Sequence, residues 1–325
     1  MSKKVSVIIP NWNGKELLVD CLTSLSHQKF NDYEVILVDN ASSDDSLDYT
    51  IENFSSVKIV KLNKNYGFAK AINEGVKASS AEYAVFLNND TKVDRNWLKS
   101  IVDCADKNRD VISVNSKILN FYNRKLIDGV GIEVNEVGQA RSIGWGETDN
   151  NQYSKEMYIF GATGGAALFR RNDFIKIGMF DESFFMYSEE VDFAFRAQFI
   201  GYKSIYCPKA IVFHKHKATA KKLPHHIEYW QFRNMTVTII KDFSFDLLMK
   251  NWRWLKIILV HFNTYFYQIK NGYFCAPFLA DLWIISRLLI LIKKRKEIQS
   301  TRKVDLTYID SFLKEKKITF WGLLK

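Results

Sequence analysis

Short apolar runs alternate with helical patterns along the first ninety residues, and this rhythm constrains the fold more than any other feature. The runs have strand length and are VSVII (5–9), EVILVD (34–39), VKIVKL (57–62) and YAVFLN (83–88). Between the first two, Leu18, Cys21, Leu22 and Leu25 recur at helical spacing. Because the runs are continuous rather than alternating, they favour parallel strands covered on both faces. The sequence therefore predicts an α/β fold with a mainly parallel central sheet.

In open parallel sheets, ligands bind beyond the carboxyl ends of the strands. Polar segments follow three of the predicted strands, at 10–14, 39–45 and 88–94. The first, PNWNG, contains no GxGxxG, and the chain contains no GxxxxGK[ST], which disfavours NAD(P) and P-loop chemistry. The other two, VDNASSD and FLNND, offer carboxylate and amide oxygens. Such groups suit a base or ribose hydrogen bond, or a divalent cation.

Two later segments also have readable patterns. TGGAALFRR (163–171) predicts a strand that is entered through two glycines. A largely apolar helix is predicted over 189–200, with an Asp192–Arg196 pair at i,i+4 spacing and Gly201 as its C-terminal cap.

Length and composition exclude several classes of protein. A chain of 325 residues with 47% hydrophobic content can bury a large core, which excludes intrinsic disorder. Its four cysteines form no CxxC pair, which argues against a zinc ribbon or a disulfide framework and favours a reducing cytosol. The first apolar run is five residues long, too short for the core of a signal peptide, so we expect no export by that route.

The basic residues are concentrated in the last third of the chain. Residues 1–220 carry a net charge of −1 and residues 221–325 one of +11. The same third holds five of the eight tryptophans, Trp230, Trp252, Trp254, Trp283 and Trp321. This composition suits an anionic membrane surface or a nucleic acid. We therefore predict a catalytic domain over 1–220 and a basic, aromatic-rich helical region over 221–325.

Two apolar segments in that region favour lipid over nucleic acid. Residues 255–269 form an amphipathic helical stripe, and 274–292 have about the length of a membrane span. Pro277, Asp281 and Arg287 interrupt the second segment, and KKRK (293–296) follows it. Each central charge costs roughly 2.5–3.5 kcal/mol on insertion scales. We expect an interfacial helix whose lysines meet anionic headgroups. The alternative is an ordinary helical bundle, since apolar stripes are usually core.

Six motifs together resemble a known family. In chain order they are VSVIIPNWNG, VDNASSDDS, NYGFAKAINEG, FLNNDTKVD, TGGAALFRR and FDESFFMYSEEVDFAFRA. They are similar to the successive motifs of family 2 glycosyltransferases, which have the GT-A fold, and they cover residue 5 to about residue 216. The segment EYWQFRN (228–234) also resembles one that follows the catalytic domain in bacterial rhamnosyltransferases of polysaccharide assembly.

The resemblance implies a nucleotide site and a metal site. The implied nucleotide-binding residues are Pro10, Asn11, Asn13, Asp39, Asn65, Gly67, Asn73 and Asn89. NND matches the metal motif, which makes Asp90 the direct ligand of Mg²⁺ or Mn²⁺, with Asn88 in place of the usual first aspartate. His214, in AIVFHKH, matches a late histidine ligand. A divalent ion suits this chemistry because it neutralises the charge that develops on a nucleoside diphosphate leaving group.

Structural roles are the alternatives for these residues. Asp39 suits an Asx-turn after its strand, and His214 suits a satisfied polar group on a strand. Asp90 could open a helix over 95–104, although Asp94 is the better N-cap for it.

The resemblance also implies the candidate base. Glu190 and Glu189 occupy the two acidic positions of the family's Glu-Asp pair, and the second position usually acts as base, so we assign Glu190, with Glu189 as the fallback. Gly164 and Gly165 would admit the donor sugar close to the backbone, and Tyr187 would line the acceptor entrance.

The expected function is a metal-dependent inverting glycosyltransferase. It would move a rhamnose-like sugar or another hexose from a dTDP- or UDP-linked donor to a lipid-linked saccharide. It would act peripherally on the cytoplasmic face of the cell membrane, without a nucleic-acid partner. The alternative is a glycosyltransferase-like scaffold that has lost catalysis and docks partners at the membrane.

Overall fold

The computed structural model describes residues 2–215 and 224–315, so Trp321 of the basic region lies outside the described residues. The strands are β1 (Val5–Asn11), β2 (Tyr33–Asp39), β3 (Lys58–Lys61), β4 (Tyr83–Leu87), β5 (Thr91–Val93), β6 (Val111–Asn120), β7 (Ile127–Gly129), β8 (Ile132–Asn135), β9 (Ala140–Ser142), β10 (Met157–Ile159), β11 (Ala166–Arg170), β12 (Lys203–His214) and β13 (Leu313–Lys314).

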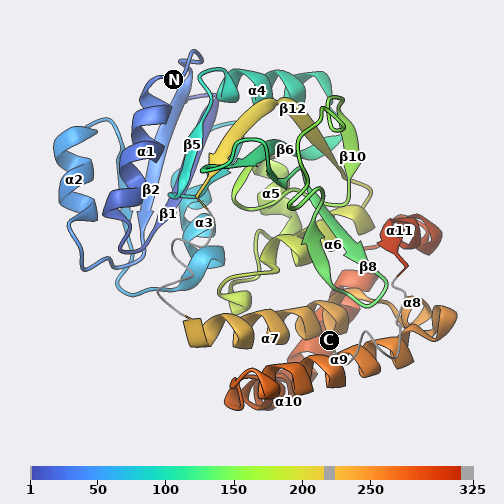
Figure 1. Cartoon of the computed structure of the whole chain (residues 1–325). Helices are drawn as coiled ribbons and strands as arrows, with labels where there is room; N and C mark the ends of the chain where they lie inside the picture. The colour runs from blue at the N-terminus through green and yellow to red at the C-terminus, as the bar shows by residue number, and fades with distance from the viewer. Residues whose placement is uncertain (1, 216–223, 316–325) are drawn as a thin grey trace.

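The helices include two short 3₁₀ segments, η1 and η3. They are α1 (Lys15–Ser26), α2 (Ser46–Asn53), α3 (Gly67–Ala78), α4 (Trp97–Lys107), α5 (Arg171–Ile177), η1 (Glu182–Phe184), α6 (Glu189–Phe199), α7 (Pro224–Asp242), α8 (Phe245–Met249), η3 (Lys250–Trp252), α9 (Arg253–Lys270), α10 (Cys275–Ser300) and α11 (Leu306–Phe312). Figure 1 shows their arrangement.

The large sheet has the strand order β10-β12-β6-β11-β4-β1-β2-β3. All four strands predicted from the apolar runs form, and they pair in parallel as β4-β1-β2-β3. Strand β11 joins this half to β6 through two antiparallel ladders. Asn11 is in register with Asp39, so the carboxyl ends of β1 and β2 lie side by side. The fold class predicted from the sequence is confirmed.

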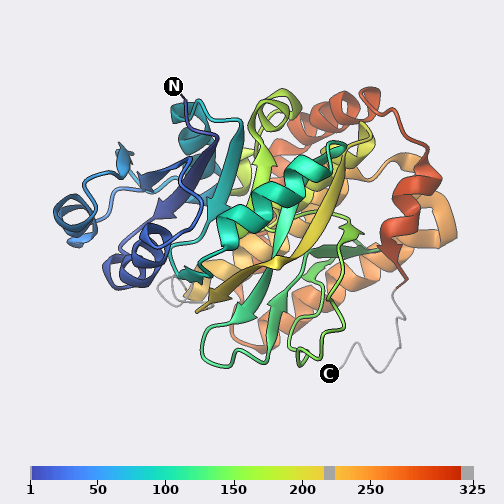
Figure 2. The same cartoon turned by 90° about the horizontal axis from the view of Figure 1, so that it is seen from above.

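Helices cover both faces of the sheet, as continuous apolar strands require. Val7 faces a core shared with α1 and α4, and its neighbour Ile8 faces a core shared with α3, α5 and α6. Figure 2 shows α4 lying over β12 and β6. Successive strand residues point to opposite faces, so a run without polar positions can fill both cores.

Two local predictions meet different outcomes. Helix α6 covers Glu189–Phe199, and Gly201 adopts a φ of 93°, in agreement with the sequence pattern. Asp94, in contrast, is not the N-cap of α4. The helix begins at Trp97, and the Asp94 carboxylate accepts a hydrogen bond of 2.8 Å from the backbone N–H of Asn96. Asp94 therefore forms an Asx-turn that begins three residues before the first residue of the helix.

The helices after residue 224 share a hydrophobic core with the preceding part of the chain. Ile239 of α7 and Phe243, which follows that helix, pack with Phe195 and Phe199 of α6 and with Ile132 of β8. Helix α7 lies between the sheet region and the pair α9–α10 in Figure 1. The change in composition near residue 220 therefore does not divide the chain into two separate hydrophobic cores.

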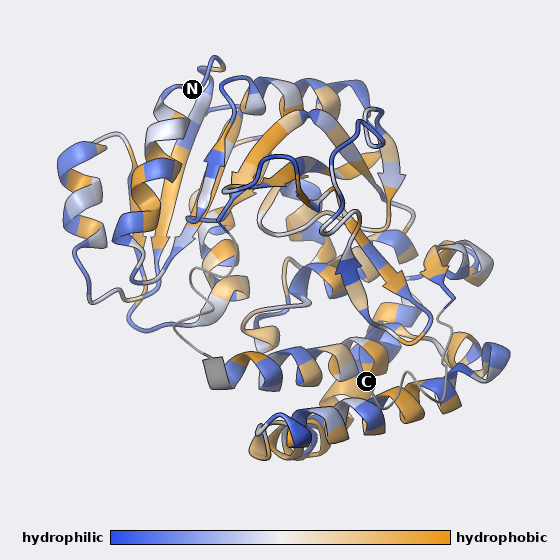
Figure 3. Cartoon of the chain, in the orientation of Figure 1, coloured by the Kyte–Doolittle hydropathy of each residue, from blue (hydrophilic) through white to orange (hydrophobic). Residues whose placement is uncertain are grey.

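Helices α9 and α10 contain the two predicted apolar segments. Within the described residues, α10 is the one helix that is long and apolar enough to cross a membrane, judged by length and composition. Of its most apolar 18-residue stretch, 28% is buried in the protein. Figure 3 shows apolar residues along both helices. Lys293 and Lys296 are exposed, whereas Lys294 forms an ion pair with Asp181 at 2.7 Å. The expectation that all of KKRK faces lipid is corrected, because Lys294 points into the protein.

Candidate functional site

The carboxyl ends of β1, β2 and β4 bring three predicted nucleotide residues together. Asn89 donates to the side-chain oxygen of Asn11 at 2.8 Å, and both side chains are buried. Asp39 is 2% exposed and accepts through Oδ2 from the N–H of Ser42, three residues further along the chain, at 3.2 Å. Its Oδ1 is buried and has no hydrogen-bond partner among the described residues. Because a buried carboxylate oxygen needs a donor, this atom suits a base or ribose group.

Asn13 organises the loop beside this edge. Its side-chain oxygen accepts from the N–H of Ser43 at 2.7 Å and of Asp44 at 3.3 Å, and its own φ is 51°. Pro10 lies within β1, in register with Val38. These contacts give Asn13 a role in shaping the loop.

The start of α3 approaches the same edge. The Asn65 side chain accepts from the N–H of Gly67 at 2.9 Å, and the Gly67 carbonyl accepts from the Asn40 amide at 3.1 Å. Gly67 has a φ of 84°, and a Cβ there would lie 2.3 Å from the carbonyl oxygen of Phe185, so only glycine fits. The missed residue Asn40, buried next to Asp39, is the direct link between β2 and this turn.

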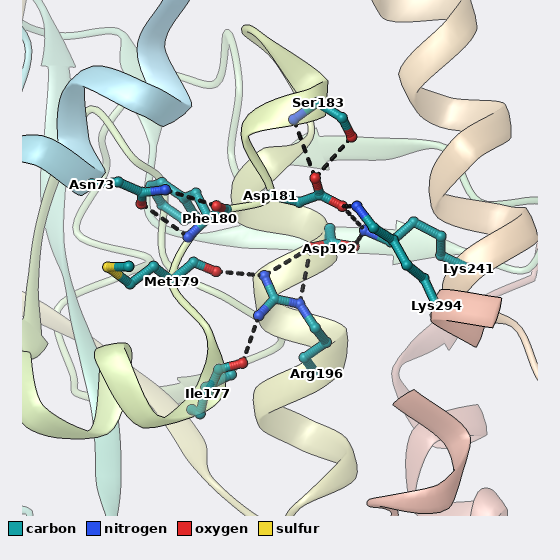
Figure 4. Close-up of polar contacts among 10 residues, drawn as sticks. All are labelled: Asn73, Ile177, Met179, Phe180, Asp181, Ser183, Asp192, Arg196, Lys241 and Lys294. Atoms are coloured by element: carbon teal, nitrogen blue, oxygen red, sulfur yellow. Dashed lines mark hydrogen bonds and ion pairs between the residues drawn. The ribbon is translucent and has the colours of Figure 1, made fainter. Parts of the chain in front are cut away.

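The Asn73 side chain hydrogen-bonds the backbone of a segment far along the chain. Its side-chain oxygen accepts from the N–H of Phe180 at 3.1 Å, and its nitrogen donates to the Phe180 carbonyl at 2.8 Å (Figure 4). The nitrogen also lies 3.1 Å from Glu182. In this structure Asn73 therefore ties α3 to the segment before α6, and its role in nucleotide binding stays a prediction.

Asp90 and His214 meet at the end of β12. Nε2 of His214 lies 3.2 Å from Oδ1 of Asp90, and Nδ1 hydrogen-bonds the carboxylate of Asp128 on β7. Burial lowers the pKa of His214, but the bonds to Asp128 and Asp90 outweigh it and raise that pKa to about 10. Sequence reasoning missed Asp128, because it stands in an irregular stretch without a motif.

These residues fit a divalent cation that is completed by a substrate. No cluster of three or more His, Cys, Asp or Glu residues suited to hold a metal occurs in the described ranges. Mg²⁺ is typically bound by one or two carboxylates plus substrate phosphates, at about 2.0–2.1 Å, which puts neighbouring ligands about 3 Å apart. The 3.2 Å between Asp90 and His214 matches that spacing. The Asp128 contact has the form of the carboxylate that orients a ligating histidine.

Gly164 lies against the side chain of Phe68, and Gly165 lies against that of Asn88. A Cβ on Gly165 would lie 3.1 Å from Nδ2 of Asn88, and one on Gly164 would lie 2.8 Å from the ring of Phe68. A side chain at either position would therefore be crowded, and the role of the two glycines at the donor sugar stays a prediction.

The Glu189–Glu190 pair begins α6 beside a cavity. Glu190, Tyr187, Thr163 and Thr238 line a cavity of about 770 Å³ between α6, α7 and the β8–β9 hairpin. Glu189 is 4% exposed and does not line it. Burial and the charge of Glu190 raise the pKa of Glu189 well above its usual range, and burial raises the pKa of Glu190.

Three residues that line this cavity each have a buried polar atom without a hydrogen-bond partner among the described residues. These atoms are Oε2 of Glu190, Oγ1 of Thr163 and Oγ1 of Thr238. A polar ligand with several hydroxyls would satisfy them. Both threonines escaped sequence reasoning, because Thr163 only precedes the two glycines and Thr238 lies far along the chain on α7.

Buried ion pairs support the start of α6. Asp192 pairs with Arg196 at 2.8 Å, as predicted, and also contacts Lys241 of α7. Lys241 lies 2.6 Å from Asp181, which Lys294 of α10 also contacts (Figure 4). Despite burial, the two lysines hold the pKa of Asp181 well below its usual range. Helices α7 and α10 thus contact the chain on both sides of the Glu189–Glu190 pair.

Comparison with known protein families shows to which family the chain belongs. The family model described as glycosyl transferase family 2 matches residues 6–178. The chain belongs to this family. The match includes the carboxyl ends of β1, β2 and β4, and it ends before the glutamate pair of α6.

Relatives of this family 2 chain include proteins of bacterial glycan assembly. It is 29% identical over 133 residues to glycosyltransferase GlyG of Streptococcus pneumoniae serotype 4, covering 40% of this chain and 42% of that protein. It is 27% identical over 241 residues to O-antigen biosynthesis protein RfbC of Myxococcus xanthus, covering 70% of this chain and 18% of that protein. The chain spans less than half the length of these relatives.

Solved structures show the fold of the family 2 chain to be GT-A. The structure of GalNAc-T7 with UDP, GalNAc and Mn²⁺ superimposes with a TM-score of 0.62 at 15% identity, covering 81% of this chain and 51% of that one. The mannosyltransferase PcManGT from Pyrobaculum calidifontis, in complex with GDP-Man and Mn²⁺, gives 0.55 at 16% identity, covering 93% and 86%.

Proposed function

We propose that this chain is a metal-dependent, inverting glycosyltransferase. It transfers a rhamnose-like sugar or another hexose from a dTDP- or UDP-linked donor to a lipid-linked saccharide in cell-surface polysaccharide synthesis. The observation that carries the proposal is the pairing of two sites. The unpartnered Oδ1 of Asp39 lies at the sheet edge that also carries Asp90, and Glu190 faces a cavity with unpartnered hydroxyls.

At the sheet edge, the chain binds the nucleotide of the donor. Oδ1 of Asp39 accepts a hydrogen bond from the base or the ribose, and the bonded pair Asn11–Asn89 forms the floor next to it. Asp90 and His214 would hold the divalent cation, with Asp128 orienting the imidazole. When bound, the cation neutralises charge on the diphosphate as it leaves.

At the cavity, the chain binds the acceptor and removes its proton. The acceptor oxygen forms a bond to the anomeric carbon while the bond from that carbon to the diphosphate breaks. The acceptor proton passes to Glu190, and the nucleoside diphosphate departs with the bonding electrons. Attack by the acceptor in one displacement inverts the anomeric centre, so the chain needs no nucleophile of its own. The raised pKa of Glu190 makes its carboxylate a stronger base than an exposed one.

The names of several relatives support polymer assembly. They include the O-antigen protein RfbC, the poly(ribitol-phosphate) β-glucosyltransferase of Bacillus spizizenii and the poly-β-1,6-N-acetyl-D-glucosamine synthase of Staphylococcus epidermidis. One relative, from Serratia proteamaculans, is an undecaprenyl-phosphate 4-deoxy-4-formamido-L-arabinose transferase, which supports a lipid-linked acceptor.

Peripheral binding to the cytoplasmic face of the membrane is supported by α9 and α10. Apolar side chains stand exposed along both helices, including Phe262, Phe266, Phe278, Ile285 and Leu289. Lys293 and Lys296 are exposed at the end of the α10 stripe. Such a combination suits an apolar face in the acyl boundary with lysines at anionic headgroups.

Thermal stabilisation of the whole chain by nucleotides tests the proposal. UDP, dTDP, GDP and NAD are each added with Mn²⁺ and again with EDTA. Stabilisation by one pyrimidine diphosphate that disappears in EDTA is the expected result, because a ligand that binds only the folded state raises its stability. It is followed by Mn²⁺-dependent hydrolysis of the matching nucleotide sugar.

The outcomes separate enzyme from scaffold. Stabilisation without donor hydrolysis or transfer favours the scaffold that has lost catalysis. No stabilisation by any diphosphate removes the nucleotide site, and with it the proposed function.

A further inference from the structure

The segment just before the glutamate pair has an unusual backbone. Phe185, Tyr187 and Ser188 adopt φ values of 66°, 68° and 67°. Three non-glycine residues in the left-handed region within four positions are strained, and such strain persists only where the surroundings enforce it. The turn leads directly into Glu189 and Glu190, so its conformation determines the position and direction of their side chains.

Two residues of α7 surround this turn with hydrogen-bond donors. The side-chain nitrogen of Asn234 lies 3.0 Å from the carbonyl oxygen of Phe184, 2.8 Å from that of Met186 and 2.7 Å from that of Tyr187. Nη2 of Arg233 donates to the carbonyls of Ser183 and Phe184, at 2.9 and 2.7 Å. Asn234 is 1% exposed and Arg233 5%.

Arg233 also orients the amide of Asn234. Its Nε donates to the Asn234 side-chain oxygen at 2.8 Å, which leaves the amide nitrogen facing the turn. An amide and a guanidinium offer donors in fixed planes, so the pair can satisfy several carbonyls of one turn together. The carbonyls of Ser183, Phe184, Met186 and Tyr187 obtain side-chain donors in this way, and that of Phe184 also accepts from the backbone N–H of Met186 at 2.8 Å.

Helix α3 and a tryptophan of α7 also contact this turn. The carbonyl of Phe185 accepts from the N–H of Ala69 at 3.3 Å, and its ring stacks on Trp230 with centroids 4.6 Å apart. Trp230, Arg233 and Asn234 are spaced i, i+3 and i+4, so one face of α7 presents all three. The turn is therefore enclosed between α3 and the EYWQFRN segment.

We propose that Asn234, with its amide oriented by Arg233, is a positioning residue for the transfer reaction. It stabilises the strained Phe185–Ser188 turn, and through this turn it sets the position of Glu190 at the acceptor cavity. This inference rests on the proposed function for the reaction itself, although the hold on the turn is independent of it. It gives the EYWQFRN segment a physical role in the C-terminal region.

The test compares Asn234→Leu with Asn108→Leu in the full-length chain. Leucine has a similar volume and no donors. Asn108 is a matched control, because its half-buried amide also donates to a backbone carbonyl, that of Cys104, at 2.9 Å. Hydrogen exchange of residues 183–190 is measured first. We expect faster exchange there in Asn234→Leu and no change there in Asn108→Leu.

Kinetics of Mn²⁺-dependent hydrolysis of UDP-glucose and dTDP-rhamnose supply the second readout. We expect kcat of Asn234→Leu to fall about 10²-fold, the scale of a 1 Å misplacement, with KM for the donor nearly unchanged. A general loss of structure would raise KM as well, which this split excludes. If Asn234→Leu is not recovered folded, Asn234→Ser, which keeps one donor, takes its place.

The two measurements test separate parts of the proposal, the stabilisation of the turn and the positioning role in the reaction. Unchanged exchange over 183–190 overturns the hold on the turn. Faster exchange with wild-type kcat overturns the positioning role. A wild-type chain that hydrolyses neither donor nor transfers sugar counts against the proposed function and the positioning role, while exchange still decides the hold on the turn.

Discussion

Nζ of Lys241 on α7 lies 2.6 Å from Oδ2 of Asp181, the residue that precedes the turn leading to the glutamate pair. The same nitrogen contacts Asp192 inside α6, and both Lys241 and Asp192 are almost completely buried. A helix of the basic C-terminal region thus neutralises two carboxylates, one on each side of the Glu189–Glu190 pair. The two parts of the chain are electrostatically dependent on each other at this point.

Lys241→Met should destabilise the protein by about 3–5 kcal/mol, the usual cost of removing one partner from a buried ion pair. The physical reason is that Asp192 and Asp181 stay buried with one cation fewer, and only Arg196 and Lys294 remain beside them. Urea unfolding of the full chain measures the change. Lys99→Met is the control, since Lys99 pairs with Asp103 on the exposed face of α4 and such pairs contribute about 0.3–0.5 kcal/mol. Equal effects of the two variants would refute the structural importance of this cluster.

Asp128→Asn should weaken binding of Mn²⁺ in the presence of UDP by about 10–100-fold, because the variant no longer orients His214 with a carboxylate. Asp90→Asn should abolish Mn²⁺-dependent stabilisation by UDP altogether. Calorimetry with Mn²⁺ measures both, and Asp103→Asn on the surface is the control. Wild-type affinity in Asp128→Asn would show that Asp128 has no part in the metal site.

Glu190→Gln should retain binding of the nucleotide and lose about 10²–10⁴-fold in kcat for transfer or donor hydrolysis. Glutamine keeps the shape of the side chain but cannot take up the proton. Glu189→Gln should retain more activity, because Glu189 is buried and does not line the cavity. If Glu189→Gln is the inactive variant instead, the base is the first residue of the pair.

The pH dependence of kcat/KM should have an acidic limb above the ordinary glutamate pKa of about 4.3. Burial raises the pKa of Glu190, and activity requires the ionised form, so activity rises with pH through the raised value. The folded protein also binds protons at the pair more tightly than the unfolded chain does. Stability contributed by the pair therefore falls as pH rises from the ordinary to the raised pKa values. An acidic limb at or below pH 4.3 would contradict this.

Phe266→Ser and Leu289→Ser should each weaken sedimentation of the chain with phosphatidylglycerol vesicles about tenfold. Both side chains are exposed, and burying one in lipid contributes about 1.5–3 kcal/mol. Tyr122→Ser is the control, because Tyr122 is equally exposed but lies far from α9 and α10 in the chain. Binding that depends only on salt, with no effect of these variants, would exclude the apolar face as the contact.

Local patterns predicted much of the secondary structure and part of the site. The four parallel strands, β11, α6 and the Asp192–Arg196 pair all follow from short-range periodicity and spacing. The N-cap of α4 was wrong by two residues, because Asp94 and Asn96 compete as turn and cap residues within three positions. The side chains that lie against Gly164 and Gly165, those of Phe68 and Asn88, could not be predicted, since spacing cannot tell which side chain lies beside a glycine.

By itself, the sequence determined the α/β class and the carboxyl-end segments that meet beside Asp39 and Asp90, because period and order along the chain dictate how parallel strands align. Only the tertiary structure decided that Asp128 orients His214, that Lys294 turns inward to Asp181, and that Asn234 holds the turn before Glu189. Each of these contacts joins residues 47 or more positions apart. Pairing of β6 with both β7 and β12 creates the first contact, and packing of α7 and α10 against the sheet region creates the other two. No local pattern encodes either arrangement.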